Sequence, residues 1–200
     1  MTLLIIGVTV ALSWYCFERP QLLDRLLLWP PAIERKHQYD RFVTHGFVHA
    51  DWQHLLFNMI TLYFFGRHVE RLFLPYIGSI GFLLFYVSAI VVAMLPTFLR
   101  HRHDPNYRSL GASGAVSAVL FVFILVAPWS LIFVFFLPVP AILYAVMYVG
   151  YSVWADRNSH DNINHSAHLA GAAYGVLFTV AMEPAVLQGF VSKLLSPSFG

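Results

Sequence analysis

The sequence predicts an all-α polytopic membrane protein, a bundle of six transmembrane helices whose fourth helix is short and starts inside the membrane. Composition is the first observation behind this prediction. Of the 200 residues, 58% are hydrophobic and 11% are charged, whereas soluble domains carry about 25% charged residues. Length is the second, because a spanning helix needs about 20 apolar residues, so 200 residues allow about six. An ordinary soluble globule, a disordered chain and a coiled coil are excluded.

Charge and cysteine content narrow the partners further. The net charge is only +2, which is too small to indicate nucleic acid binding. The single cysteine, Cys16, excludes an internal disulfide and a cysteine-only metal site.

The apolar runs define the expected elements in order, within a single membrane domain over residues 1–200. Residues 18–50 mix charged and apolar side chains around a Pro-Pro break, which favours helices lying in the membrane interface. Asp51 is the expected N-cap of the second span, and Pro138 and Pro140 mark a kink or a late start in the fifth. The predicted spans are residues 2–17, 52–74, 76–98, 113–127, 130–154 and 166–190.

The fourth span is too short for a bilayer. Its 15 residues make about 22 Å of helix, against a hydrocarbon core of about 30 Å. Either the helix starts inside the membrane, or residues 109–112 extend it as non-helical backbone. Such backbone is tolerated at depth only when protein or a water-filled cavity surrounds it.

Four polar residues gather at one end of the predicted bundle. Spans two, four and six run in the same direction, so their N-terminal ends lie on one side of the membrane. These ends carry His54 and Asn58, which share a helix face, and also Ser113 and His168. Polar side chains inside spans are costly and suggest function, and helix N-termini favour a developing anion.

Small residues explain how these ends could meet. Gly171 and Gly175 lie on the same helix face as His168, and Gly114 offers a small surface on span four. Small-xxx-small faces permit close helix approach. We therefore expect the Ser113 hydroxyl to lie within reach of the His168 imidazole.

The chemistry that this arrangement predicts is acyl transfer. Serine becomes a strong nucleophile only when a base takes its proton, and His168 can supply that base. His54, the Asn58 amide and the Ser113 backbone N–H are candidate donors to the oxyanion. No acid neighbours His168 in the sequence, so a Ser-His dyad rather than a triad is expected.

Three segments resemble the rhomboid intramembrane serine proteases, most closely those of the bacterial GlpG type, in sequence, order and spacing. The resemblance implies that Ser113 is the nucleophile, that His168 is the general base, and that His54 and Asn58 assist the oxyanion. Glycines at positions 111 and 114 belong to the serine motif. The segments are Gly111-Ala112-Ser113-Gly114, Ala167-His168-Leu169-Ala170-Gly171 and His54-Leu55-Leu56-Phe57-Asn58.

The resemblance also implies a setting and a substrate class. Substrates would be single-span membrane proteins, cut at or near the bilayer surface without ATP, a metal or another cofactor. Membrane lipid would be a further partner. The location would be a bacterial inner membrane, with cytoplasmic termini and a site that opens to the periplasm. The positive-inside rule points the other way, because nine Lys or Arg residues lie on the site's side and three on the opposite side.

Several positions depart from the family pattern. Ser117 stands where GlpG-type proteins place a tyrosine that packs on the histidine, so the support of the His168 ring must differ. Asp40-Arg41 replaces the Trp-Arg pair of the first loop. Phe57 and Tyr148 are candidates for lining the lateral path of a substrate between spans two and five, although lipid contact or packing explains them equally well.

Three alternatives stay open from the residues. A metal-dependent intramembrane hydrolase could draw its ligands from five histidines, although the His-Glu-x-x-His motif of such sites is absent. A transporter or channel could use the interrupted helices and polar groups, and a rhomboid-like protein could bind membrane clients without cutting them. The five histidines are His45, His49, His54, His165 and His168.

Overall fold

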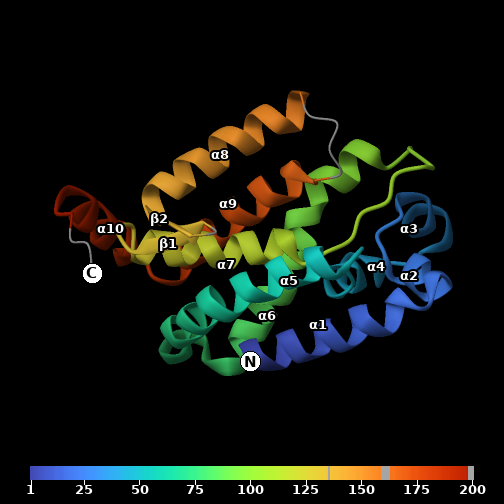
Figure 1. Ribbon diagram of the computed structural model, residues 1–200, viewed down its shortest axis with the longest axis horizontal. Coiled ribbons are helices and arrows are strands. Elements are labelled where there is room, and N and C mark those ends of the chain that lie inside the picture. Colours follow the sequence, from blue (N-terminus) through green and yellow to red (C-terminus); the bar gives the residue numbers. More distant parts are fainter. Residues whose placement is uncertain (135, 159–162, 198–200) are drawn as a thin grey trace.

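The computed structural model describes residues 1–134, 136–158 and 163–197, and these are predominantly helical (Figure 1). A π-helical turn joins α5 to α6, a 3-10 turn follows α4, and the long α6 is broken inside. The helices are α1 (Thr2–Phe17), α2 (Pro20–Leu26), α3 (Pro30–Lys36), α4 (Arg41–Thr44), η1 (His45–Phe47), α5 (Trp52–Thr61), η2 (Leu62–Gly66), α6 (Arg67–His101), α7 (Ser113–Val126), α8 (Ala141–Asn158), α9 (His165–Met182) and α10 (Ala185–Leu195).

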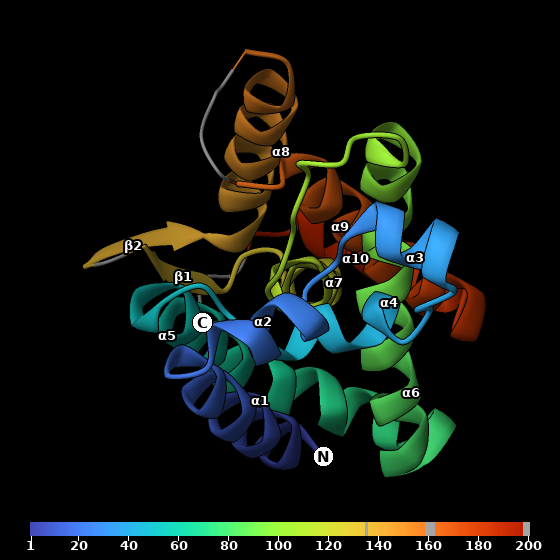
Figure 2. The ribbon, with the colours of Figure 1, turned by 90° about the vertical axis from the view of Figure 1, so that its right-hand side faces the viewer.

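Helix α7 is the centre of the bundle. It runs between α5, α6, α8 and α9 (Figures 1 and 2), and its side chains are buried almost without interruption from Gly114 to Leu125. A helix that is apolar on all faces is stable when it is surrounded by protein or lipid. The expected start at Ser113 is confirmed, and the helix ends one residue before the expected boundary.

The turn between the second and third predicted spans lies at Gly78, not at Pro75 as the sequence suggested. Helical backbone continues through Pro75, and the chain turns at Gly78, whose φ is 66° and ψ is −178°. Only glycine adopts that conformation without strain, whereas the backbone at Pro75 stays helical although a proline there removes a hydrogen bond and favours a kink. The glycine therefore sets the position of the reversal.

The all-α prediction was incomplete, because a hairpin precedes α8. Strands β1 (Leu131–Val134) and β2 (Leu137–Pro140) pair antiparallel, with Leu131 opposite Pro140. The fifth helix starts at Ala141 rather than at residue 130, so the late start was the correct alternative. The prolines at 138 and 140 explain it, since proline disfavours helical backbone at its own and the preceding position.

The sixth predicted span, 166–190, is also broken. Helix α9 ends at Met182, and α10 continues after Glu183 and Pro184 at an angle of 114°. Glu183 has extended backbone (φ −143°, ψ 90°), the conformation favoured before a proline, so α9 ends there and the chain bends. The prediction that one helix continues to residue 190 is therefore wrong for residues 183–190.

The region between α1 and α5 consists of short helices, as expected, and it holds the segment that precedes α7. The backbone of Leu28 exchanges two hydrogen bonds with Ser109, of 2.9 and 3.1 Å. The Trp29 indole donates to the Pro105 carbonyl at 3.0 Å. The non-helical backbone before Ser113 is thus fixed by protein contacts.

One helical stretch of the described residues, Trp52–His101, is long and apolar enough to cross a membrane by itself. Helices α9 and α10 would together make a second, and α1 and α7 are apolar but shorter. Six membrane crossings therefore stay a prediction.

Candidate active site

Ser113 begins α7, and the backbone before it makes a close approach to α5. Gly111 has a φ of 115°, and its amide donates to the His45 carbonyl at 2.9 Å. A Cβ at Gly111 would lie 2.6 Å from Cε1 and 2.7 Å from Nε2 of His54. Glycine is thus required here both by the backbone and by the His54 ring.

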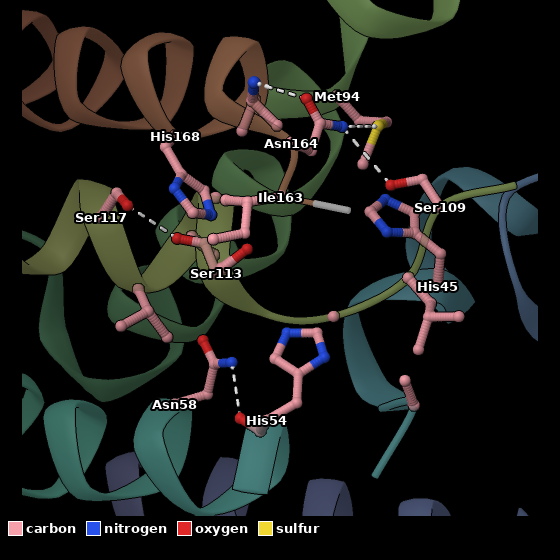
Figure 3. A pocket seen from close by; sticks show the side chains of 18 of the residues that line it. His45, His54, Asn58, Met94, Ser109, Ser113, Ser117, Ile163, Asn164 and His168 are labelled. Carbon is pink, nitrogen blue, oxygen red and sulfur yellow. Dashed lines mark hydrogen bonds between the residues drawn. The ribbon is translucent and has the colours of Figure 1, made fainter. Parts of the chain in front are cut away.

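His168 lies on α9, which packs against α7 with backbone touching backbone. A Cβ at Gly171 would lie 2.0 Å from the Gly114 carbonyl oxygen, and one at Gly175 would lie 2.2 Å from that of Ala118. This approach brings the N-terminal turns of both helices together, and Ser113 and His168 lie next to each other in the same cavity (Figure 3).

His54 and Asn58 face this pair from α5. Asp51 caps that helix by accepting the His54 amide at 2.8 Å, as the sequence predicts. The Asn58 side-chain nitrogen donates to the His54 carbonyl at 2.9 Å, and its second hydrogen is left for another acceptor. Figure 3 shows the His54 ring and the Asn58 amide on the opposite side of the cavity from His168.

The cavity has a volume of about 1100 Å³, and all four predicted site residues line it. Both candidate gate residues, Phe57 and Tyr148, also line it. Phe57 is half exposed at the surface of α5. A cavity of this size, lined by both apolar and polar side chains, is a candidate binding site.

Tyr148 has a contact that sequence reasoning did not assign. Its ring stacks on the His168 ring, with 6.1 Å between centroids and 23° between planes. Its hydroxyl lies 2.6 Å from the Ser117 hydroxyl. The absence of a tyrosine at position 117 was the signal that another residue must support His168.

Two buried histidines hold the segment before Ser113. The His49 Nε2 accepts the Ala112 amide at 3.4 Å, and its Nδ1 lies 3.0 Å from the Ser13 hydroxyl. Burial lowers the pKa of His49 to about 3 and that of His45 to about 4. Both rings are therefore neutral at pH 7, and His49 can accept from Ala112 only in that form.

Asn164 was missed by the sequence analysis and links three segments. Its side-chain oxygen accepts the Ala167 amide at 3.0 Å, as an N-cap of α9, and the Thr97 hydroxyl at 2.8 Å. Its nitrogen donates to the hydroxyls of Tyr107 and Ser109, at 3.2 and 3.4 Å. Asparagine before a helical run is a recognisable N-cap signal.

Four of the five histidines of the metal alternative lie in two pairs, His49 with His54 and His165 with His168. Over residues 1–134, 136–158 and 163–197, no group of three or more His, Cys, Asp or Glu side chains is placed to hold a metal ion.

Comparison with known proteins places the chain in a family. Residues 36–184 match the family model for the rhomboid domain. RHOMBOID-like protein 12, mitochondrial, of Arabidopsis thaliana is 31% identical over 190 residues, which cover 88% of this chain and 55% of that protein. Rhomboid protease GlpG of Haemophilus influenzae is 34% identical over 104 residues, covering 50% of this chain and 48% of that protein.

The matches cover only part of each relative and include proteins from different compartments. Rhomboid protease GluP of Bacillus subtilis is 29% identical over 157 residues, covering 78% of this chain and 28% of that protein. The chain spans about half the length of the curated relatives that it matches, or less. Mitochondrial and bacterial proteins are both among them, so they do not single out the bacterial type. The chain belongs to the rhomboid family.

Proposed function

We propose that the chain is an intramembrane serine endopeptidase that hydrolyses peptide bonds of membrane-spanning proteins. The observation that carries this proposal is the close packing of α7 on α9, which brings Ser113 beside His168 in one cavity lined by His54 and Asn58. Relatives whose names describe rhomboid proteases add support.

The reaction starts when the Ser113 oxygen attacks the carbonyl carbon of the scissile bond. His168 takes the hydroxyl proton as the new C–O bond forms. The carbonyl becomes an oxyanion, which accepts hydrogen bonds from the Ser113 amide, the His54 ring and the free hydrogen of the Asn58 amide. The start of α7 adds a partial positive charge beside it.

Collapse of this intermediate breaks the C–N bond and leaves an acyl group on Ser113. The leaving amine takes the proton from the protonated His168. A water molecule then attacks the acyl-enzyme and gives a proton to His168. The ester C–O bond breaks, the Ser113 oxygen takes that proton back from His168, and the carboxyl product leaves. No cofactor enters these steps.

We further propose that the chain crosses a membrane six times as one domain. In the GlpG-like arrangement the membrane is the bacterial inner membrane, the termini are cytoplasmic, and the cavity opens to the periplasm. Cysteine-accessibility labelling in the loop of residues 100–108 tests this sidedness. Labelling from the cytoplasmic side alone would contradict it.

The test of the activity uses the purified protein in detergent or proteoliposomes with a single-span substrate. Cleavage and fluorophosphonate labelling of Ser113 are both expected, and both should be lost in Ser113→Ala with the fold retained. Loss of cleavage in a chelator, restored by zinc, would favour the metal-dependent alternative. Solute flux that survives Ser113→Ala, without cleavage, would favour the transporter.

A further inference from the structure

The base of the proposed dyad is in contact with a ring from a different helix. Tyr148 comes from α8, whereas His168 belongs to α9, and their rings are nearly parallel at 23° with centroids 6.1 Å apart. A second ring near His168, that of His165, meets it edge-on at 76°. Tyr148 therefore supplies a flat surface against which the imidazole can keep its orientation.

The hydroxyl of Tyr148 is tied to the helix of the nucleophile. The Ser117 oxygen lies 2.6 Å from the Tyr148 oxygen and 2.8 Å from the Ser113 carbonyl. A carbonyl can only accept, so the single Ser117 hydrogen is donated to Ser113. The Tyr148 hydroxyl must then donate to Ser117, which makes a chain of two hydrogen bonds that ends on the backbone of Ser113.

Two further aromatic rings pack against Tyr148 besides that of His168. Phe121 on α7 and Tyr144 on α8 pack against it, with centroids 5.5 and 5.8 Å away. The next residue toward the N-terminus of α8, Met147, is more than half exposed. The ring is thus fixed on three sides, on a helix at the edge of the bundle (Figure 2).

We propose that Tyr148 is a positioning residue that holds the His168 imidazole toward Ser113, with Ser117 as its anchor. This inference rests on the proposed function. It replaces a purely gate-lining role for Tyr148, and it assigns to Ser117 and Tyr148 together the support that a tyrosine at position 117 would otherwise supply. The orientation of the base then depends on how α8 sits against α7.

A small fluorophosphonate separates positioning from gating, because it reaches Ser113 without the lateral path that a transmembrane substrate needs. The measured quantity is the second-order rate constant for labelling Ser113 in detergent. Tyr148→Leu should lower it about tenfold or more, because small misplacements of a catalytic group carry losses of that order. Met147→Ala, on the same helix, should label like the wild type.

Tyr148→Phe keeps the ring and should lose only about threefold, the effect of one hydrogen bond. Ser117→Ala should lose about the same, and the double variant should lose no more than either single variant, because both remove one interaction. This cycle keeps the inference testable if Tyr148→Leu fails to fold.

If Ser113 in Tyr148→Leu is labelled at the wild-type rate, the inference is overturned, even if the variant cleaves a transmembrane substrate poorly. Tyr148 would then only line the path of the substrate. If the double variant loses the product of the two single losses in labelling rate, Ser117 does not anchor Tyr148. If Ser113 of the wild type is not labelled at all, the proposed function fails instead, so the two failures are distinguishable.

Discussion

Gly171 on α9 lies directly against the Gly114 carbonyl of α7, so close that a Cβ on Gly171 would be 2.0 Å from that oxygen. We expect Gly171→Ala to push the helices apart and to lower the free energy of unfolding by about 1–3 kcal/mol or more, the range for overpacked sites. Cleavage should fall with it, because Ser113 and His168 separate.

Gly150→Ala is the matched control, since a Cβ at this helical glycine of α8 would meet nothing within 4 Å. It should be neutral or stabilising by up to about 1 kcal/mol, from helix propensity. Thermal unfolding in detergent measures both variants. Equal stability of the two would contradict the backbone contact between α7 and α9.

The turn at Gly78 gives a second prediction. Gly78→Ala places a Cβ on backbone with a φ of 66° and a ψ of −178°, a region that costs other residues about 1–3 kcal/mol. Pro75→Ala should not lower stability, because the helix already continues through that position and alanine is the better helix former. A larger loss for Pro75→Ala than for Gly78→Ala in thermal unfolding would place the turn at the proline.

Oxyanion stabilisation gives a third prediction. His54→Ala and Asn58→Ala should each lower kcat by about 10²–10³, the effect of removing one such donor, with a smaller change in KM. His68→Ala is the control, because its exposed ring does not line the cavity and instead lies 2.8 Å from the Phe64 carbonyl. A variant that raised only KM would show that its side chain binds substrate without stabilising the oxyanion.

Acid should destabilise the fold through its buried histidines. Burial lowers the pKa of His45 to about 4 and of His49 to about 3 in the folded state, whereas the unfolded chain has about 6.5. Below that pH the unfolded state binds more protons, so the free energy of unfolding falls as pH falls. Each histidine contributes about 1.4 kcal/mol per pH unit between about pH 6 and its folded pKa.

Equilibrium unfolding in detergent from pH 7 to pH 4 measures this slope. His45→Asn should make this slope shallower by one histidine's contribution. Identical slopes in the wild type and His45→Asn would mean that His45 is not buried in the neutral form.

Much of the candidate site could be predicted from local sequence. Asp51 caps α5 because an aspartate precedes an apolar run. Helix α7 begins at Ser113 because a short glycine-rich segment ends there and a continuous apolar run follows. His54 and Asn58 share a face at a spacing of four. These features depend on residues within one helical turn of each other.

The sequence by itself determined the membrane-type composition, the apolar segments and the polar residues at the starts of three of them. Only the tertiary structure decided where the chain turns at Gly78, that a hairpin precedes α8, and that the Tyr148 ring lies on the His168 ring. Hydropathy and helical periodicity are local properties, so they identify a segment that avoids water. Which ring then lies on which depends on distances between helices, and backbone contacts such as that of Gly171 on Gly114 set those distances.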